Sequence, residues 1–294
     1  MKSRYFLQLV GLSALWGGNF LFTRMAAPQL GASLTAASRV FLGALTLAII
    51  MRYLKLRWPR EHWRELLLLG AVGIAGPHYL YSWSSLYLPA GYSAVLAISS
   101  VLFGAMASAW LKEDTLTWPR ILGCLVAFVG ITLVVRLGPI HPSPQLVVAA
   151  ITTVFGSALS GCTAPLLKRA TRRMEPLAVT AAIHLAAFIW LLPFAAWSLP
   201  QAHFTPTAVA AVIVMGMVTS GVAYWLYMRI VQKVSPVAAL SSTFMITLFG
   251  VFWGHVVLNE SFTPASYAGG VLVLLATLLV AGYNPLRRAE LARP

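Results

Sequence analysis

The chain has few charged residues and very few acidic ones. Charged side chains make up 10% of the 294 residues, and Asp and Glu together number 7 against 21 Lys and Arg. A soluble domain carries about 25% charged residues, so an ordinary water-soluble fold is excluded. A basic excess is also typical of nucleic-acid-binding proteins, but here the cations are spread over short loops and form no continuous basic segment. We therefore expect no nucleic-acid partner.

Cysteines and catalytic motifs are also scarce. The two cysteines, Cys124 and Cys162, lie in apolar stretches without metal-type spacing. This excludes a disulfide framework, and the sequence predicts no metal and no cofactor. Neither His-Glu-x-x-His nor Gly-x-Ser-x-Gly occurs. An intramembrane enzyme is therefore the weaker alternative from a different class.

Long apolar runs dominate instead. Hydrophobic residues make up 59% of the sequence, with a mean hydropathy of +0.81. Runs of roughly 20 residues are long enough to cross ~30 Å of hydrocarbon as helices. The sequence predicts an all-α integral membrane protein with ten spans, at residues 5–23, 33–51, 66–86, 90–111, 119–136, 145–166, 177–197, 206–228, 237–257 and 265–283.

The loop charges predict the orientation. With the N-terminus in the cytoplasm, 18 of the 21 Lys and Arg fall in cytoplasmic segments. Arg24 and Arg136 fall outside, and Arg39 lies within a span. This asymmetry follows the positive-inside rule. We expect a multi-pass protein in a lipid bilayer with both termini cytoplasmic, whose ten helices suffice to enclose a cavity in a monomer.

The two halves, residues 1–138 and 144–294, resemble each other weakly but in the same order. The aligned pairs are Gly17 with Gly161, Asn19 with Thr163, Arg24 with Lys168, Pro89 with Pro236, and Glu113 with Glu260. Five helices per repeat is an odd number, so the second repeat crosses the membrane upside down. Inverted repeats typically enclose a midplane site and permit alternating access. We therefore predict two inverted five-helix repeats around a central cavity that binds a small solute.

The predicted spans hold no acidic residue near their centres. A proton-driven antiporter for organic cations usually needs such a carboxylate, so a zwitterionic or neutral solute is favoured. Facilitated diffusion remains an alternative to proton coupling.

Arg39 is the one cation near mid-span; it either holds a substrate carboxylate or pairs with helix carbonyls. His78 and His184 are mid-span groups whose charge can change near neutral pH, or interior histidines held by hydrogen bonds.

Aromatic and hydroxyl side chains supply the remaining candidates. Such a mixed wall suits an amino acid, because rings stack on its side chain and hydroxyls bind its charged ends. Packing or lipid contact is the competing interpretation for the rings, and bonding to the helix's own carbonyls for the hydroxyls. The candidates are Trp16, Asn19, Tyr79, Ser82, Trp83, Ser99, Ser160, Thr163, Tyr224 and Ser242.

Three features carry a family resemblance. The segment Trp16-Gly17-Gly18-Asn19-Phe20, Arg39, and the Pro…Glu pattern of spans four and nine resemble the EamA-type drug/metabolite transporters. Within that superfamily the chain is most similar to YddG-type amino-acid exporters. The resemblance implies a cavity lined chiefly by helices one, three, four, six, eight and nine. It also implies export of neutral or aromatic amino acids and related metabolites across a bacterial inner membrane. A broad drug exporter and a nucleotide-sugar carrier are alternatives; the latter needs more cavity cations than Arg39.

Overall fold

The computed structural model describes residues 3–88, 90–115, 117–135, 143–258 and 264–281, and every regular element among them is helical. The first-half elements are α1 (Ser3–Gly17), α2 (Asn19–Leu30), α3 (Ala32–Tyr53), η1 (Arg60–His62), α4 (Trp63–Gly70), η2 (Ala71–Ala75), α5 (Gly76–Ser84), α6 (Ala90–Ala97), α7 (Ser99–Trp110) and α8 (Trp118–Val135). The second-half elements are α9 (Pro144–Arg173), α10 (Pro176–Ser198), η3 (Leu199–Gln201), α11 (Pro206–Ile213), η4 (Val214–Ala223), α12 (Tyr224–Val231), α13 (Pro236–Leu240), α14 (Ser242–Leu258) and α15 (Pro264–Ala281).

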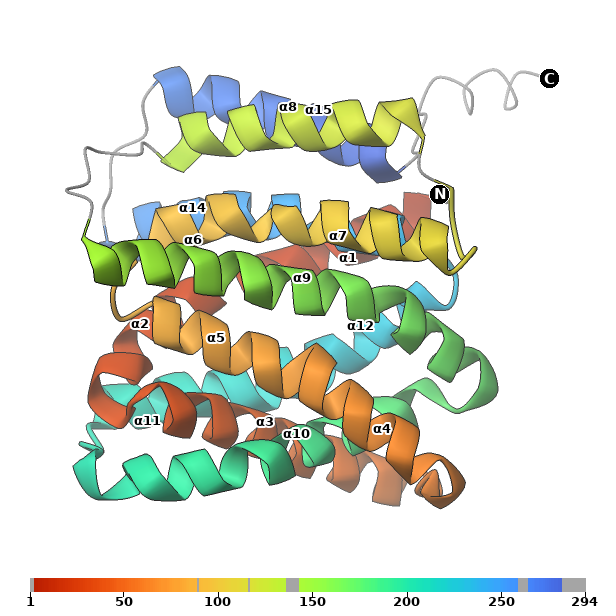
Figure 1. Cartoon of the computed structure of the whole chain (residues 1–294), viewed down its shortest axis with the longest axis vertical. Helices are drawn as coiled ribbons and strands as arrows, with labels where there is room; N and C mark the ends of the chain where they lie inside the picture. Colours follow the sequence, from red (N-terminus) through yellow and green to blue (C-terminus); the bar gives the residue numbers. More distant parts are fainter. Residues whose placement is uncertain (1–2, 89, 116, 136–142, 259–263, 282–294) are drawn as a thin grey trace.

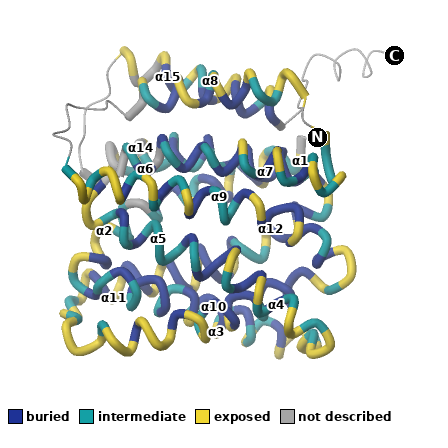
Figure 2. The backbone as a smooth tube through the Cα atoms, in the orientation of Figure 1, coloured by how far each residue is buried: buried dark blue, intermediate teal, exposed yellow. Residues whose placement is uncertain are grey.

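Five helical stretches are long and apolar enough to cross a membrane. They are Arg4–Leu30, Ala32–Tyr53, Pro144–Arg173, Pro176–Gln201 and Pro206–Val231. Shorter apolar helices cover Val95–Trp110, Trp118–Leu133, Pro236–Gly250 and Ala268–Val280. Buried residues line the inner faces of these helices, while exposed ones mark their outer faces and the helix ends (Figure 2). The fold is thus that of an all-helical membrane protein.

The first helical stretch extends further than predicted. The predicted end at residue 23 is wrong, because α2 continues to Leu30. It stops at Gly31, whose φ of 79° lies in the region that favours glycine. Arg24 is therefore part of a helix rather than of a loop.

Helix packing follows a reciprocal pattern between the halves. In the first half, α1 packs on α14 and α3 packs on η4; in the second, α9 packs on α7 and α10 packs on α4 and η2. Two pairs join equivalent positions, α3 with α10 and α8 with α15, and they lie at opposite edges of the molecule (Figure 1). Of the aligned residues, Pro89 and Glu260 lie outside the described residues, as does most of the connector at 138–144.

Aligned glycines make equivalent close contacts. A Cβ atom on Gly17 of α1 would lie 2.7 Å from the backbone nitrogen of Gly250 in α14. A Cβ atom on Gly161 of α9 would lie 2.8 Å from the backbone nitrogen of Gly104 in α7. Both distances are shorter than real Cβ contacts allow, so glycine is required where the helices cross.

The two π-helical segments lie at matching positions. η2 follows Gly70, where a Cβ would lie 2.7 Å from the carbonyl oxygen of Ile183 in α10. η4 contains Gly216, where a Cβ would lie 3.0 Å from the carbonyl oxygen of Arg39 in α3. π-Helical turns are rare and concentrate at functional sites, and here both lead directly into helices that line the central cavity described below.

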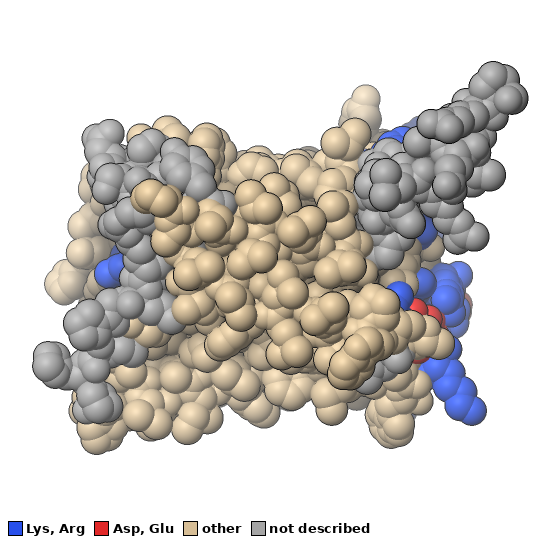
Figure 3. All heavy atoms as spheres, turned by 90° about the horizontal axis from the view of Figure 1, so that it is seen from above, with Lys and Arg blue, Asp and Glu red and all other residues tan. Residues whose placement is uncertain are grey.

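Cationic side chains gather at one end of the molecule (Figure 3). Several are paired there: Arg169 and Arg172 of α9 bind Glu113 at 2.8 and 3.0 Å, and Arg173 binds Glu65 at 2.7 Å. The hydrogen bond from Arg169, with Arg172 close by, holds the pKa of Glu113 below its ordinary value of 4.5 despite partial burial. We call this end the cation-rich end.

Candidate functional site

A cavity of about 260 Å³ lies between the two halves. Helices α1, α2, α3, α5, α6, α7, α9, α12 and α14 contribute lining residues, together with Gly73 of η2 and Leu240 of α13. Two cations, Arg24 and Arg39, are among these residues, and none of them is Asp or Glu. Within the described part of the chain, the cavity therefore presents positive charge without a carboxylate to balance it.

Most of the residues singled out from the sequence meet at this cavity. Those that line it are Trp16, Asn19, Arg39, His78, Ser82, Ser160, Tyr224 and Ser242. They come from both halves of the chain, although their sequence separations reach more than 200 residues. Packing α1 against α14 and α9 against α7 brings them to one place.

Three aromatic rings form one wall. The ring of Trp16 lies 6.0 Å from that of Tyr224 and 5.1 Å from that of Tyr227, measured between centroids. The two tyrosine rings are 5.9 Å apart. These tilted and edge-on arrangements are favourable for aromatic pairs. They leave a cluster of rings that can receive an apolar or aromatic side chain.

Hydrogen bonds fix this wall across the halves. The indole Nε1 of Trp16 donates to the carbonyl oxygen of Thr219 at 3.0 Å, and the Thr219 hydroxyl donates to Asn19 Oδ1 at 2.9 Å. Thr219 lies in η4. The first helical stretch is thereby held to the π-helical segment of the second half.

Arg39 and His78 retain unused polar atoms. Arg39 donates through Nε to the Ser220 hydroxyl at 2.7 Å, and no carboxylate among the described residues lies within ion-pair distance of it. Both ring nitrogens of His78 are buried, and no side chain among the described residues bonds to them. Within the same residues, the backbone of Ile74, one helical turn earlier, is the one partner that faces His78. The terminal guanidinium nitrogens of Arg39 and one imidazole nitrogen of His78 can therefore bind a solute in the cavity.

Two predicted aromatics lie beside the cavity rather than on it. Tyr79 packs against the ring of Phe194 at 6.3 Å, and Trp83 packs against Tyr87 at 5.0 Å. Residues four apart share one helical face, and this face of α5 is turned away from the face that lines the cavity.

Three further predicted residues also lie behind the lining. The Ser99 hydroxyl bonds to its own helix at Leu96 O. The methyl group of Thr163 fills the space beside Gly73. His184 is fully buried and meets the ring of Tyr224 edge-on at 4.9 Å. His184 thus supports a cavity residue from behind.

Sequence reasoning left other lining residues out of its candidate set. The cavity-facing side of α5 carries His78, Tyr81 and Ser82, and Ser85 follows directly after the helix; Tyr81 and Ser85 each lie three residues after one of the two predicted residues, His78 and Ser82. That spacing was a usable signal, because His78 and Ser82 already marked the face. Other residues not singled out are Thr23, Arg24, Ser93, Ser100, Tyr227, Met228 and Thr243.

Comparison with known proteins identifies the family. The model of the EamA-like transporter family matches residues 4–136 and again residues 147–282. The chain belongs to the EamA-like transporter family. An uncharacterized transporter of Bacillus subtilis, YvbV, is 24% identical over 95% of this chain and 92% of its own length. An uncharacterized transporter of Archaeoglobus fulgidus is 22% identical over 75% and 79%.

A solved structure shares the fold. A crystal structure superposes with a TM-score of 0.79 over 100% of both chains at 17% identity. This likeness shows a shared fold, and the family match makes the chain a multi-pass membrane transporter.

Proposed function

We propose that this EamA-family transporter carries small neutral or aromatic amino acids and related metabolites out of a bacterial cytoplasm by alternating access. The observation that carries the proposal is the central cavity, with its aromatic wall and its two arginines and with no acid among the described residues that line it. Arg39 binds the solute carboxylate, and the rings of Trp16, Tyr224 and Tyr227 receive its side chain. The protein acts as a carrier and not as an enzyme.

The reciprocal packing supports two inverted repeats, residues 1–138 and 144–294, as the basis of alternating access. Ten spans in a 5+5 arrangement put the cation-rich end and both termini in the cytoplasm of an inner membrane. Exchanging the halves maps the α1–α14 contact onto the α9–α7 contact. A carrier of this symmetry reaches mirror-related states open to either side by changing those two contacts.

Size and charge favour amino acids over the other solutes of the superfamily. A volume of about 260 Å³ falls below the ~300–1,000 Å³ typical of sites for drug-sized ligands. The same volume disfavours a nucleotide sugar, although Arg24 adds a second cation. Cationic drugs are disfavoured because Arg24 and Arg39 face the solute and no carboxylate lies among the lining residues that the structure describes.

The test is flux in liposomes containing the purified protein. Labelled phenylalanine, methionine or threonine should cross down its own gradient with saturation and with no ion gradient imposed. Trp16→Ala should reduce the flux of phenylalanine, whereas Tyr79→Ala, an aromatic truncation on the face of α5 beside the cavity, should leave it near wild type. Equal losses in both variants would contradict the assignment of the cavity.

Two further arms separate the alternatives. If amino acids cross only when a pH gradient is imposed, transport is coupled to protons and is not facilitated diffusion. The proposed substrate class would then still hold. Movement of ethidium without movement of any amino acid would overturn the proposal in favour of a drug exporter.

A further inference from the structure

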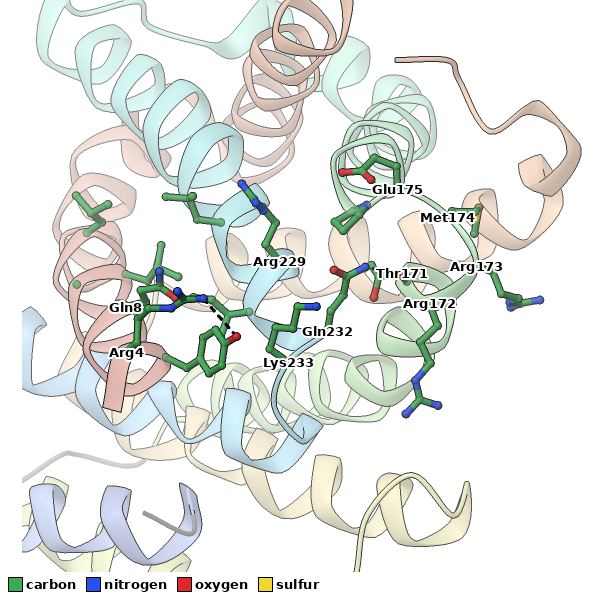
Figure 4. Close-up of a pocket in the computed structure, with 17 residues that line it drawn as sticks. Arg4, Gln8, Thr171, Arg172, Arg173, Met174, Glu175, Arg229, Gln232 and Lys233 are labelled. Carbon is green, nitrogen blue, oxygen red and sulfur yellow. Dashed lines mark hydrogen bonds between the residues drawn. The ribbon is translucent and has the colours of Figure 1, made fainter. Parts of the chain in front are cut away.

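A second and larger pocket, of about 880 Å³, opens at the cation-rich end. It lies between the start of α1, the junction of α9 with α10, and the end of α12 (Figure 4). Its lining residues include five cations, Arg4, Arg172, Arg173, Arg229 and Lys233, and one acid, Glu175. None of its lining residues belongs to the central cavity.

The five cations fall into two groups. Arg172 is bound by Glu113 and Arg173 by Glu65, and both side chains extend away from the hollow in Figure 4. Arg4, Arg229 and Lys233 have no acidic partner within ion-pair distance among the described residues. Figure 4 shows Arg4 on one side of the hollow and Arg229 and Lys233 on the other. Arg4 of α1, Arg229 of α12 and Lys233 of the turn after α12, none of them ion-paired among the described residues, are suited to a phosphate group.

Aromatic rings hold two of these cations in place. The guanidinium of Arg4 lies 5.2 Å from the ring centroid of Tyr5, and that of Arg229 lies 5.5 Å from the ring centroid of Trp225. Gln232 is fixed by donating its side-chain amide to the carbonyl oxygen of Thr171. The polar end of the pocket is therefore partly ordered before any ligand arrives.

The other end of the pocket is apolar and partly exposed: Gly11, Leu15 and Leu226 are exposed, whereas Leu12 and Ile230 are buried. Along α1 it is lined by Gly11, Leu12 and Leu15, and along α12 by Leu226 and Ile230. A Cβ atom built on Gly11 meets no atom within 4 Å, so the helix surface is open there. From Arg4 to Leu15 the helix rises about 16 Å, which is close to the depth of one leaflet of the hydrocarbon core.

We propose that this pocket is a binding site for an anionic phospholipid of the leaflet at the cation-rich end. The phosphate lies among Arg4, Arg229 and Lys233, and an acyl chain lies along the groove beside Gly11. A soluble phosphate ion would use only the polar end, whereas a lipid uses both ends of the pocket. The proposal rests on the membrane location of the chain and does not depend on the transported solute.

Native mass spectrometry of the purified full chain tests it. The protein in detergent is titrated with phosphatidylglycerol or with phosphatidylcholine of the same acyl chains. We expect preferential retention of phosphatidylglycerol, weakened about 10- to 30-fold by Arg229→Gln with Lys233→Gln. The matched control, Arg57→Gln with Arg60→Gln, removes two exposed cations outside the pocket and should retain wild-type binding.

Gly11→Phe tests the apolar end separately. A Cβ atom at this exposed position meets no other atom within 4 Å, so we expect folding to be preserved, and the melting temperature without added lipid checks this. We expect this variant to lose phosphatidylglycerol retention although all its cations remain. Binding that is unchanged in both pocket variants, or reduced equally in the control, would overturn the proposal. Displacement of the lipid by millimolar inorganic phosphate, with Gly11→Phe binding like wild type, would instead assign the pocket to a soluble anion.

Discussion

The central cavity and the pocket at the cation-rich end both contain arginines, but the surroundings of those arginines differ. In the cavity, Arg39 lies among aromatic rings and hydroxyls in a space of about 260 Å³. At the cation-rich end, Arg4 and Arg229 line a space more than three times larger that continues into a partly exposed apolar groove. The first arrangement suits a whole small solute, and the second suits the headgroup of a lipid whose chains stay in the membrane.

The difference shows that cationic charge alone does not define a transport site. At the cation-rich end, positive charge is expected from the positive-inside rule. Within the membrane it is costly and therefore points to function. The predictions below test whether the two regions are independent.

Removing the cavity cation should have the largest effect. Arg39→Met should reduce the ratio of maximal flux to KM for phenylalanine about 10- to 100-fold, because a hydrogen bond to a charged group contributes about 1.5–3 kcal/mol. Arg39→Lys should recover part of the flux. Liposome flux measures both, and Arg52→Met, an exposed cation at the end of the same helix, is the control. Loss of phosphatidylglycerol binding in Arg39→Met would break the separation of the two regions.

Truncating the aromatic wall should have a smaller and more selective effect. Trp16→Ala should raise the KM for phenylalanine about 3- to 10-fold, because an aromatic pair contributes about 0.5–1.5 kcal/mol beyond area burial. The KM for threonine, which has no ring, should rise less. An equal rise for both amino acids would show that Trp16 supports the cavity without contacting the solute side chain.

The paired cations should contribute modestly to stability, with a defined pH dependence. Glu113→Gln should cost about 1–2 kcal/mol at pH 7, because the Glu113 side chain is only 7% exposed although its arginine partners are partly solvated. Because folding lowers the pKa of Glu113 below 4.5, the stabilisation is present above that pH and is lost as pH falls through the folded value. Melting temperatures of wild type and variant should therefore differ at pH 7 and converge in strong acid. A constant difference would contradict the ion-pair explanation.

Blocking the lipid groove should have the smallest effect on transport. Gly11→Phe should change phenylalanine flux in phosphatidylcholine liposomes by less than about 2-fold, because the ring occupies space outside the central cavity. Initial rates measure this directly. A severe loss in neutral lipid would show that the groove takes part in the transport movement itself.

Local sequence patterns predicted the helical membrane fold well. Each span can be recognised from the length of its own apolar run and from its lack of acidic residues, without knowledge of the other spans. The end of the first span was misplaced because Arg24 looked like a loop residue, whereas the helix continues to Gly31. The choice between faces of α5 was harder. Tyr79 and Ser82 differ only by rotation around one helix, and the packing of distant helices decides which face meets the cavity.

Residues brought together across the halves were the least predictable. Tyr227 joins Trp16 and Tyr224 only because α1 contacts α12. His184 is a titratable residue near mid-span, which favoured a place in the cavity lining. In the structure it lies behind the ring of Tyr224 and is not among the lining residues. Whether a residue lines the cavity or lies behind its lining depends on the packing of distant helices, which the spacing of residues within one helix does not encode.

The most direct test of the central claim compares two solutes that differ only in the carboxylate. Wild-type protein in liposomes should transport phenylalanine at least about 10-fold more efficiently than 2-phenylethylamine. In Arg39→Met this preference should largely disappear. The contact at issue joins the Arg39 guanidinium to the solute carboxylate; the variant lacks the guanidinium and the amine lacks the carboxylate. Equal or faster transport of 2-phenylethylamine by the wild type would contradict the assignment of Arg39 and with it the proposed substrate class.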